Sequence, residues 1–123
     1  MQDPSQPQAK WNIVHTNLAA FNKFVDSFER RDAEWIRDES VARFQRFRTP
    51  FHNTEHYTHL VGDLWELRLR RNPNVLIRIF FLEVGGSLLV ITGFYNKKKH
   101  PASNYQKEQI TIAFDAANKY LER

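Results

Sequence analysis

The chain has 123 residues, the usual size of one domain and enough to bury a hydrophobic core without disulfide bonds or a structural metal. It contains no cysteine, which excludes disulfide frameworks, thiolate metal sites and cysteine nucleophiles and is compatible with the cytoplasm, where we expect the protein to act. No apolar run approaches the roughly 18 residues of a membrane span. The net charge of +4 favours an anionic partner, provided that the positive charges are clustered.

The N-terminal part of the chain predicts a leader followed by a short strand. Residues 1–9 are polar and lack the pattern of a secretion signal, so we expect a disordered leader. Residues 10–15 combine Trp11 with β-branched residues, which is typical of a strand. Because no linker or repeat follows the leader, residues 10–123 are expected to form a single domain.

Two helices are expected next. Residues 17–31 carry apolar side chains at three-to-four spacing and predict an amphipathic helix that Thr16 or Asn17 caps. Residues 32–47 repeat the pattern and predict a second helix with Asp32 as its N-cap.

Three histidines follow the second helix. His52, His56 and His59 are spaced by four and three residues, which on a helix would place them on one face, where they could bind a transition metal. The segment follows Pro50 and has no apolar periodicity, so the sequence favours a loop with surface histidines and no metal site. No cofactor is expected either.

The apolar period then changes from helical to alternating, which indicates β-strands. Residues 63–71 alternate between apolar and charged side chains, and residues 75–82 and 87–95 are nearly continuous apolar runs. Turn residues separate the three segments at positions 72–74 and at the Gly85-Gly86 pair. The sequence therefore predicts an antiparallel meander.

A last helix closes the chain. Ser103 and Gln106 have the spacing of a capping box, and the residues that follow carry an apolar stripe. The predicted fold is α+β, in which an N-terminal strand and two helices pack on an antiparallel meander, followed by a C-terminal helix.

The predicted register brings two arginines together. With a turn at residues 72–74, Arg68 lies directly opposite Arg78, an arrangement that costs up to about 1 kcal/mol unless an anion lies between the charges. With a two-residue turn at Gly85-Gly86, Arg78 also lies opposite Gly93, which has no side chain to fill the space. A basic hollow is expected there.

Further cations gather around this hollow. Between Leu64 and His100 the only acids are Glu66 and Glu83, against seven cations: Arg68, Arg70, Arg71, Arg78, Lys97, Lys98 and Lys99. Such clustering is what binding to an RNA or DNA backbone requires. The ordinary alternative is that Arg68 pairs with an acid and that the lysines form a solvated loop.

The same segments resemble a known family of toxins. The features that carry the resemblance are the Glu66-Leu67-Arg68 triplet, the single Arg78 in an apolar strand, and Gly93-Phe94 ahead of the lysine run. Together with Ala113 and Tyr120 in the last helix, they are similar to the RelE/ParE/HigB superfamily of type II toxin–antitoxin toxins, and in particular to its phage-derived, HigB-like branch.

This resemblance implies a function and partners. Many toxins of this superfamily cut mRNA, often on the ribosome, and so inhibit translation. Each is neutralised by a small helix-turn-helix antitoxin encoded by a neighbouring gene. The ribose 2′-OH attacks the adjacent phosphate, so the toxin must orient the RNA, stabilise negative charge and move protons, and it needs no metal.

The residues suited to these roles are arginines, lysines, a histidine and a tyrosine. Arg68 and Arg78 would stabilise charge, because a guanidinium can hold two phosphate oxygens. The candidates for proton transfer are Lys97, Lys98, Lys99 and His100, and of these His100 is the more natural choice near neutral pH. Candidate RNA-binding residues are Arg70, Arg71, Lys97 and Tyr105. Tyr105 could either stack on a base or donate a proton.

The resemblance leaves a second activity open. Ribosome-dependent RelE toxins carry additional basic residues on the strand where this chain has Leu64 and Glu66. The ParE relatives share the scaffold but inhibit DNA gyrase by protein contact and cleave nothing, so the alternative is a gyrase-inhibiting toxin without nuclease activity.

Overall fold

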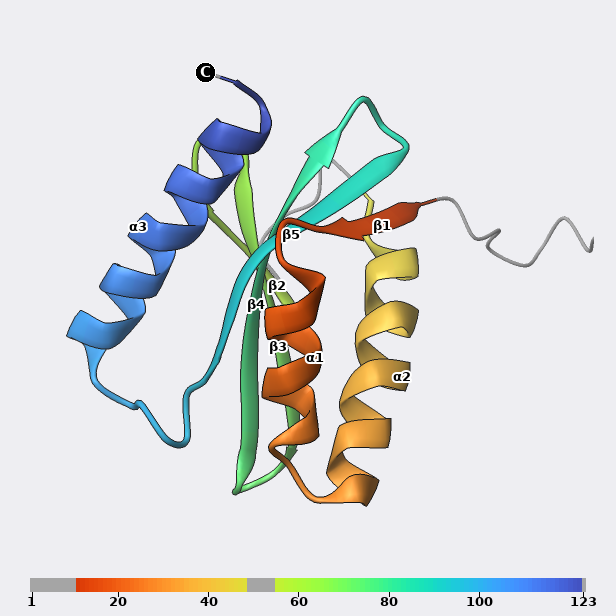
Figure 1. Ribbon diagram of the computed structural model, residues 1–123, viewed down its shortest axis with the longest axis vertical. Helices are drawn as coiled ribbons and strands as arrows, with labels where there is room; N and C mark the ends of the chain where they lie inside the picture. The colour runs from red at the N-terminus through yellow and green to blue at the C-terminus, as the bar shows by residue number, and fades with distance from the viewer. Residues whose placement is uncertain (1–10, 49–54, 123) are drawn as a thin grey trace, which may run out of the picture.

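The computed structural model describes residues 11–48 and 55–122, so the expected leader, Pro50 and His52 lie outside the described residues. The elements in chain order are β1 (Asn12–His15), α1 (Leu18–Asp26), α2 (Arg30–Arg46), β2 (Tyr57–Val61), β3 (Leu64–Asn72), β4 (Val75–Val84), β5 (Leu88–Asn96) and α3 (Ser103–Tyr120) (Figure 1). The predicted α+β fold and its meander are confirmed.

The five strands form one mixed sheet in the order β1-β5-β4-β3-β2. The strands from β2 to β5 pair antiparallel, whereas β1 pairs parallel to β5 through Asn12–His15 and Leu88–Ile91.

The strand β2 corrects the prediction of a loop. Its pairing begins with Tyr57 opposite Leu67, and the buried Tyr57 hydroxyl donates to the backbone oxygen of Arg43, 2.6 Å away. The segment has no apolar run because β2 is a short edge strand that buries few of its side chains.

Helices cover both faces of the sheet. Figure 1 shows α1 and α2 side by side on one face and α3 on the opposite face. The main core lies under α1 and α2 and contains Val25, Ile36, Phe44, Leu67, Ile79 and Phe81. Under α3, Ala113 packs with Phe80, and Ala117 packs with Val90. No helix in the described parts of the chain is long and apolar enough to cross a membrane.

The two N-terminal helices differ from the prediction at their ends. Asn17 caps α1 as expected, since its side chain accepts from the Ala20 backbone N–H. The helix ends at Asp26 rather than continuing to residue 31. Asp32 is not the N-cap of α2, because that helix begins at Arg30, and Asp32 lies in its first turn.

The predicted capping box of α3 is also wrong. The helix begins at Ser103, its N-cap is Ala102, and no side chain caps it. Gln106 instead donates from Nε2 to Oε2 of Glu66 across a distance of 3.2 Å. This tertiary hydrogen bond to the sheet replaces the predicted capping contact, and it ties the first turn of α3 to β3.

Candidate functional site

Arg68 and Arg78 lie directly opposite each other on β3 and β4, as the sequence predicts. Both are half-buried, on the sheet face that α3 partly covers. Opposed residues of antiparallel strands have Cβ atoms about 5 Å apart, so the two guanidinium groups start from neighbouring positions.

The predicted neighbour of Arg78 on β5 is wrong. Tyr95, not Gly93, lies opposite Arg78, and Gly93 lies opposite Phe80. Two features move the register: the turn after Val84 has three residues, and Thr92 forms a bulge.

Gly93 therefore has a packing role. A Cβ at that position would lie 3.1 Å from the Cβ of Ala113 and 3.2 Å from the Phe80 ring. The missing side chain lets α3 approach the sheet, so Gly93 is not the floor of a basic hollow.

A basic cavity of about 480 Å³ does contain both arginines. We use this name for the space lined by Arg43, Glu55, His56, Arg68, Arg70, Leu76, Arg78 and Lys97. Five of these residues are cationic and one is acidic. Arg43 is already neutralised by Glu39, whose Oε1 lies 2.6 Å from its Nε.

A buried carboxylate lies beneath the cavity. Glu66 is 3% exposed, and its Oε1 lies 3.8 Å from Nε of Arg78, while its Oε2 accepts the bond from Gln106. Burial lowers the pKa of Arg78, and the Glu66 carboxylate opposes this effect. Because the pKa of a guanidinium starts far above neutrality, Arg78 stays charged at neutral pH. Glu66 thus holds the side chain of Arg78 without removing its charge.

Arg70 and Arg71 diverge, although they are neighbours in the chain. Arg70 is exposed and lines the basic cavity. Arg71 follows an irregularity in the pairing and turns to α2, where its Nε lies 3.5 Å from Oδ1 of Asp32, and its guanidinium lies over the Trp35 ring. The structure thus places Arg71 away from the other predicted RNA-binding residues.

The lysine run is also divided. Lys97 follows β5 and lines the basic cavity, whereas Lys98 is exposed and lines neither of the two cavities described here. Lys99 and His100 line a second space of about 410 Å³, together with Tyr105. The structure does not bring Lys98, Lys99 and His100 together with the arginine pair.

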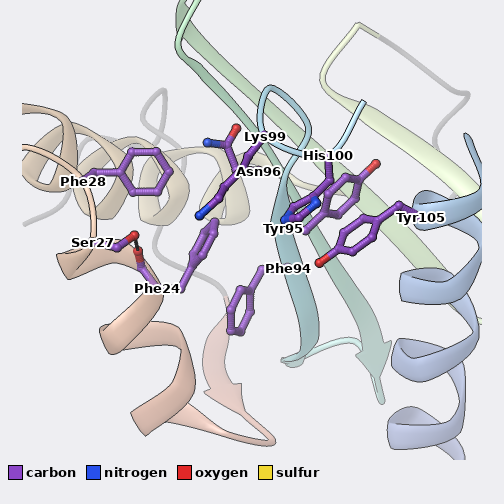
Figure 2. A pocket seen from close by; sticks show the side chains of 9 residues that line it. All are labelled: Phe24, Ser27, Phe28, Phe94, Tyr95, Asn96, Lys99, His100 and Tyr105. Atoms are coloured by element: carbon purple, nitrogen blue, oxygen red, sulfur yellow. Dashed lines mark hydrogen bonds between the residues drawn. The ribbon is translucent and has the colours of Figure 1, made fainter. Parts of the chain in front are cut away.

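We call this second space the aromatic cavity. Its lining residues are Phe24, Ser27, Phe28, Phe94, Tyr95, Asn96, Lys99, His100 and Tyr105 (Figure 2). The rings of His100 and Tyr105 are stacked, with centroids 4.0 Å apart and planes at 12°.

Sequence reasoning missed four residues of the basic cavity, and the two with a basic side chain are Arg43 and His56. His56 precedes β2, and its backbone oxygen accepts from the Arg68 N–H at 2.8 Å. Because the sequence predicted no strand there, nothing placed His56 beside Arg68. Arg43 reaches the cavity from α2, a contact that no local pattern encodes.

The possibility of a shared histidine face can be examined for His56 and His59, which lie in the described part of the chain. His56 and His59 do not share a helical face, because β2 begins between them. Nε2 of His59 lies 2.6 Å from the Gly62 backbone oxygen. Within residues 11–48 and 55–122, no three histidine or acidic side chains come together as a metal site.

Comparison with known proteins assigns the chain to a family. No curated protein and no solved structure gives a match to the chain. The model of one family, Phage derived protein Gp49-like (DUF891), matches residues 23–118, which run from the second half of α1 through α2 and the meander to most of α3. The chain therefore belongs to the Gp49-like family, a RelE/HigB-like family of toxin-like proteins.

Proposed function

We propose that this protein is the toxin of a type II toxin–antitoxin pair and that it inhibits translation by cleaving mRNA. The observation that carries the proposal is the surplus of positive charge at the basic cavity, where Arg70 and Lys97 add to the opposed Arg68–Arg78 pair and exceed the charge of the nearby carboxylates. Family membership supports the toxin role. We place the chain in the phage-derived, HigB-like branch and expect its partner to be a small helix-turn-helix antitoxin.

In this mechanism the RNA supplies its own nucleophile. The 2′-OH attacks the adjacent phosphorus, a bond forms between them, and the P–O5′ bond breaks. This produces a cyclic phosphate and a free 5′-OH. Arg68 and Arg78 hold the phosphate oxygens as negative charge develops, because guanidinium groups can form paired hydrogen bonds with them. Arg70 and Lys97 bind the neighbouring phosphates.

We assign proton transfer to His56. It lines the same cavity as the arginine pair, and an imidazole exchanges protons near neutral pH. The sequence nominated Lys97, Lys98, Lys99 and His100 for this step; Lys97 lines the basic cavity, whereas the other three do not. A His56→Gln variant should therefore lose cleavage while RNA binding persists.

The test is induction of the protein in a bacterial host, with primer extension on abundant transcripts. Wild-type protein should arrest growth and create new mRNA 5′ ends, and Arg78→Ala should reduce cleavage about 10²- to 10³-fold. Arg71→Ala is the matched control, because Arg71 forms an ion pair with Asp32 of α2. Its loss should leave the 5′ ends unchanged.

A second variant tests whether the positive charge of Arg78 is enough or whether the geometry of its guanidinium is also needed. It also controls for misfolding of the alanine variant. Arg78→Lys retains a cation beside Glu66 but cannot hold two oxygens in a fixed fork, so it should fold and cleave poorly. Growth arrest with intact transcripts and induced DNA-damage signalling would overturn nuclease activity and favour the gyrase-inhibiting alternative.

A further inference from the structure

The aromatic cavity lies along a part of β5 that lacks a second neighbouring strand within the described residues. The strand β1 pairs with β5 only as far as Ile91. The Lys97 N–H donates to the Leu76 oxygen of β4 at 2.7 Å. Because backbone groups alternate in direction along a strand, those of Phe94 and Asn96 point away from β4. The Asn96 oxygen accepts from the His100 N–H at 3.0 Å, so the strand edge that borders the cavity is the part of β5 at Phe94.

Rings border the cavity on two sides. Figure 2 shows Phe24, Phe28 and Phe94 on one side and Tyr95, His100 and Tyr105 on the other. The centroids of Phe24 and Phe94 are 4.8 Å apart, and those of Tyr95 and Tyr105 are 5.5 Å apart. Flat aromatic faces favour a planar ligand, and the volume of about 410 Å³ is in the range of small-ligand sites.

The charge of the cavity selects among planar ligands. Its lining contains Lys99 and the titratable His100 but no acidic residue. A planar group attached to an anionic backbone can stack on the aromatic rings and pair with the positive charge of the lysine. Nucleotides combine these two properties, and proteins bind single-stranded RNA by stacking its bases on aromatic and histidine rings.

The position of the cavity connects it with the arginine pair. Tyr95 lines the aromatic cavity, and its partner across the strands, Arg78, lines the basic cavity. The turn that follows β5 sends Lys97 to the basic cavity and Lys99 to the aromatic cavity. One RNA strand can therefore place a phosphate in one cavity and a neighbouring base in the other.

We propose that the aromatic cavity binds one unpaired base of the RNA whose backbone lies in the basic cavity, with the base stacked against the His100 and Tyr105 rings. This inference rests on the proposed RNA-cleaving function and adds a base-binding site to it. It predicts that the bases of the RNA, and not only its phosphates, contribute to affinity.

The test compares two fluorescein-labelled probes with the same phosphates. One is a 2′-O-methyl adenosine heptamer, which cannot be cleaved because its 2′ oxygens are blocked, and the other is a fully abasic heptamer. Fluorescence anisotropy gives the Kd of each probe. Wild-type protein should bind the base-bearing probe about tenfold more tightly, the effect expected for stacking of one base.

Variants locate that difference. Tyr105→Leu and His100→Ala should each bring the two Kd values within about twofold of each other, because the base can no longer stack in the cavity. The Kd of the abasic probe should change little, since that probe has no base to lose. Tyr120→Leu is the matched control, because Tyr120 is an exposed tyrosine of the same helix and should preserve the tenfold ratio. Arg70→Ala should weaken both probes equally.

The outcomes separate the two proposals. Equal, salt-sensitive affinity of the wild-type protein for both probes would overturn the base site and leave RNA binding standing. Absence of binding to either probe would overturn both proposals. If Tyr105→Leu keeps the tenfold ratio but abolishes binding of the antitoxin, the aromatic cavity is a docking site for a protein segment, and the base site is wrong.

Discussion

The two faces of the sheet are built by the same strands but differ in chemistry. On the face under α1 and α2, Leu67, Ile79 and Phe81 have no exposed surface and belong to the main apolar cluster. On the other face, Glu66, Arg68 and Arg78 are buried or half-buried and polar. Alternation along β3 and β4 assigns successive residues to opposite faces, so a single strand can serve both.

The difference between the faces follows from how much of each is covered. The pair α1 and α2 covers its face with large rings such as Phe44 and Phe47. The helix α3 packs through the small residues Ala113 and Ala117 and leaves the basic cavity accessible beside it. We infer that the first face supplies most of the stability, and that the second trades stability for a site that binds anions.

The largest expected effect is on the apolar face. Phe81→Ala should lower the free energy of unfolding by about 3–5 kcal/mol, because Phe81 is fully buried and its ring contacts Phe44 and Phe47 at centroid distances of 5.1 and 4.9 Å. Urea unfolding measures this, with Arg70→Ala on the other face as the control, expected within about 0.5 kcal/mol of wild type. Equal losses would contradict the division of roles between the faces.

The next effect tests how α3 approaches the sheet. Gly93→Val should destabilise the protein by about 1–3 kcal/mol, because the added side chain meets Ala113 and Phe80. Urea unfolding again gives the value. The double variant with Ala113→Gly should recover part of the loss, since it removes the Cβ that lies nearest. Failure of this rescue would mean that the strain lies in β4 rather than at the helix.

A smaller effect distinguishes the two adjacent arginines. Arg70→Ala should reduce the slope of log affinity against log salt by about 0.7 for single-stranded RNA, since one phosphate contact is lost. Arg71→Ala should leave the slope unchanged, because Arg71 lies beside Asp32 and Trp35. Anisotropy titrations of the uncleavable heptamer between 50 and 200 mM salt, the range over which counterion release is usually compared, give both slopes. An unchanged slope for Arg70→Ala would remove Arg70 from the RNA path.

The smallest effect is a pH dependence of stability that arises from β1. Burial lowers the pKa of His15 below its ordinary value of 6.5. The unfolded chain therefore binds the proton more readily, and stability that is present above pH 6.5 is lost as the pH falls through the folded pKa. His15→Gln should lose less stability than wild type between pH 7.5 and about 5, as measured by urea unfolding. The same loss in both proteins would assign the acid sensitivity to other groups.

The sequence by itself determined the features that depend on neighbouring residues. The alternation of residues 63–71 and a turn before Val75 predicted Arg68 opposite Arg78, and this pairing is observed. The structure reaches it by another route, because Asn72 rather than Arg71 lies opposite Val75 and an irregularity at Arg71 compensates for the shorter turn. Helical periodicity and the Asn17 cap located the start of α1 for the same local reason.

Only the tertiary structure decided how these pieces combine into cavities. The bulge at Thr92, together with the three-residue turn before β5, moved Tyr95 opposite Arg78, and the pairing of β2 brought His56 beside Arg68. Neither follows from a local pattern, because a bulge is stabilised by packing across the sheet, and a short edge strand forms only when its partner is already in place. The division of the lysine run between two cavities has the same origin, since it depends on where α1 and α3 lie relative to the end of β5.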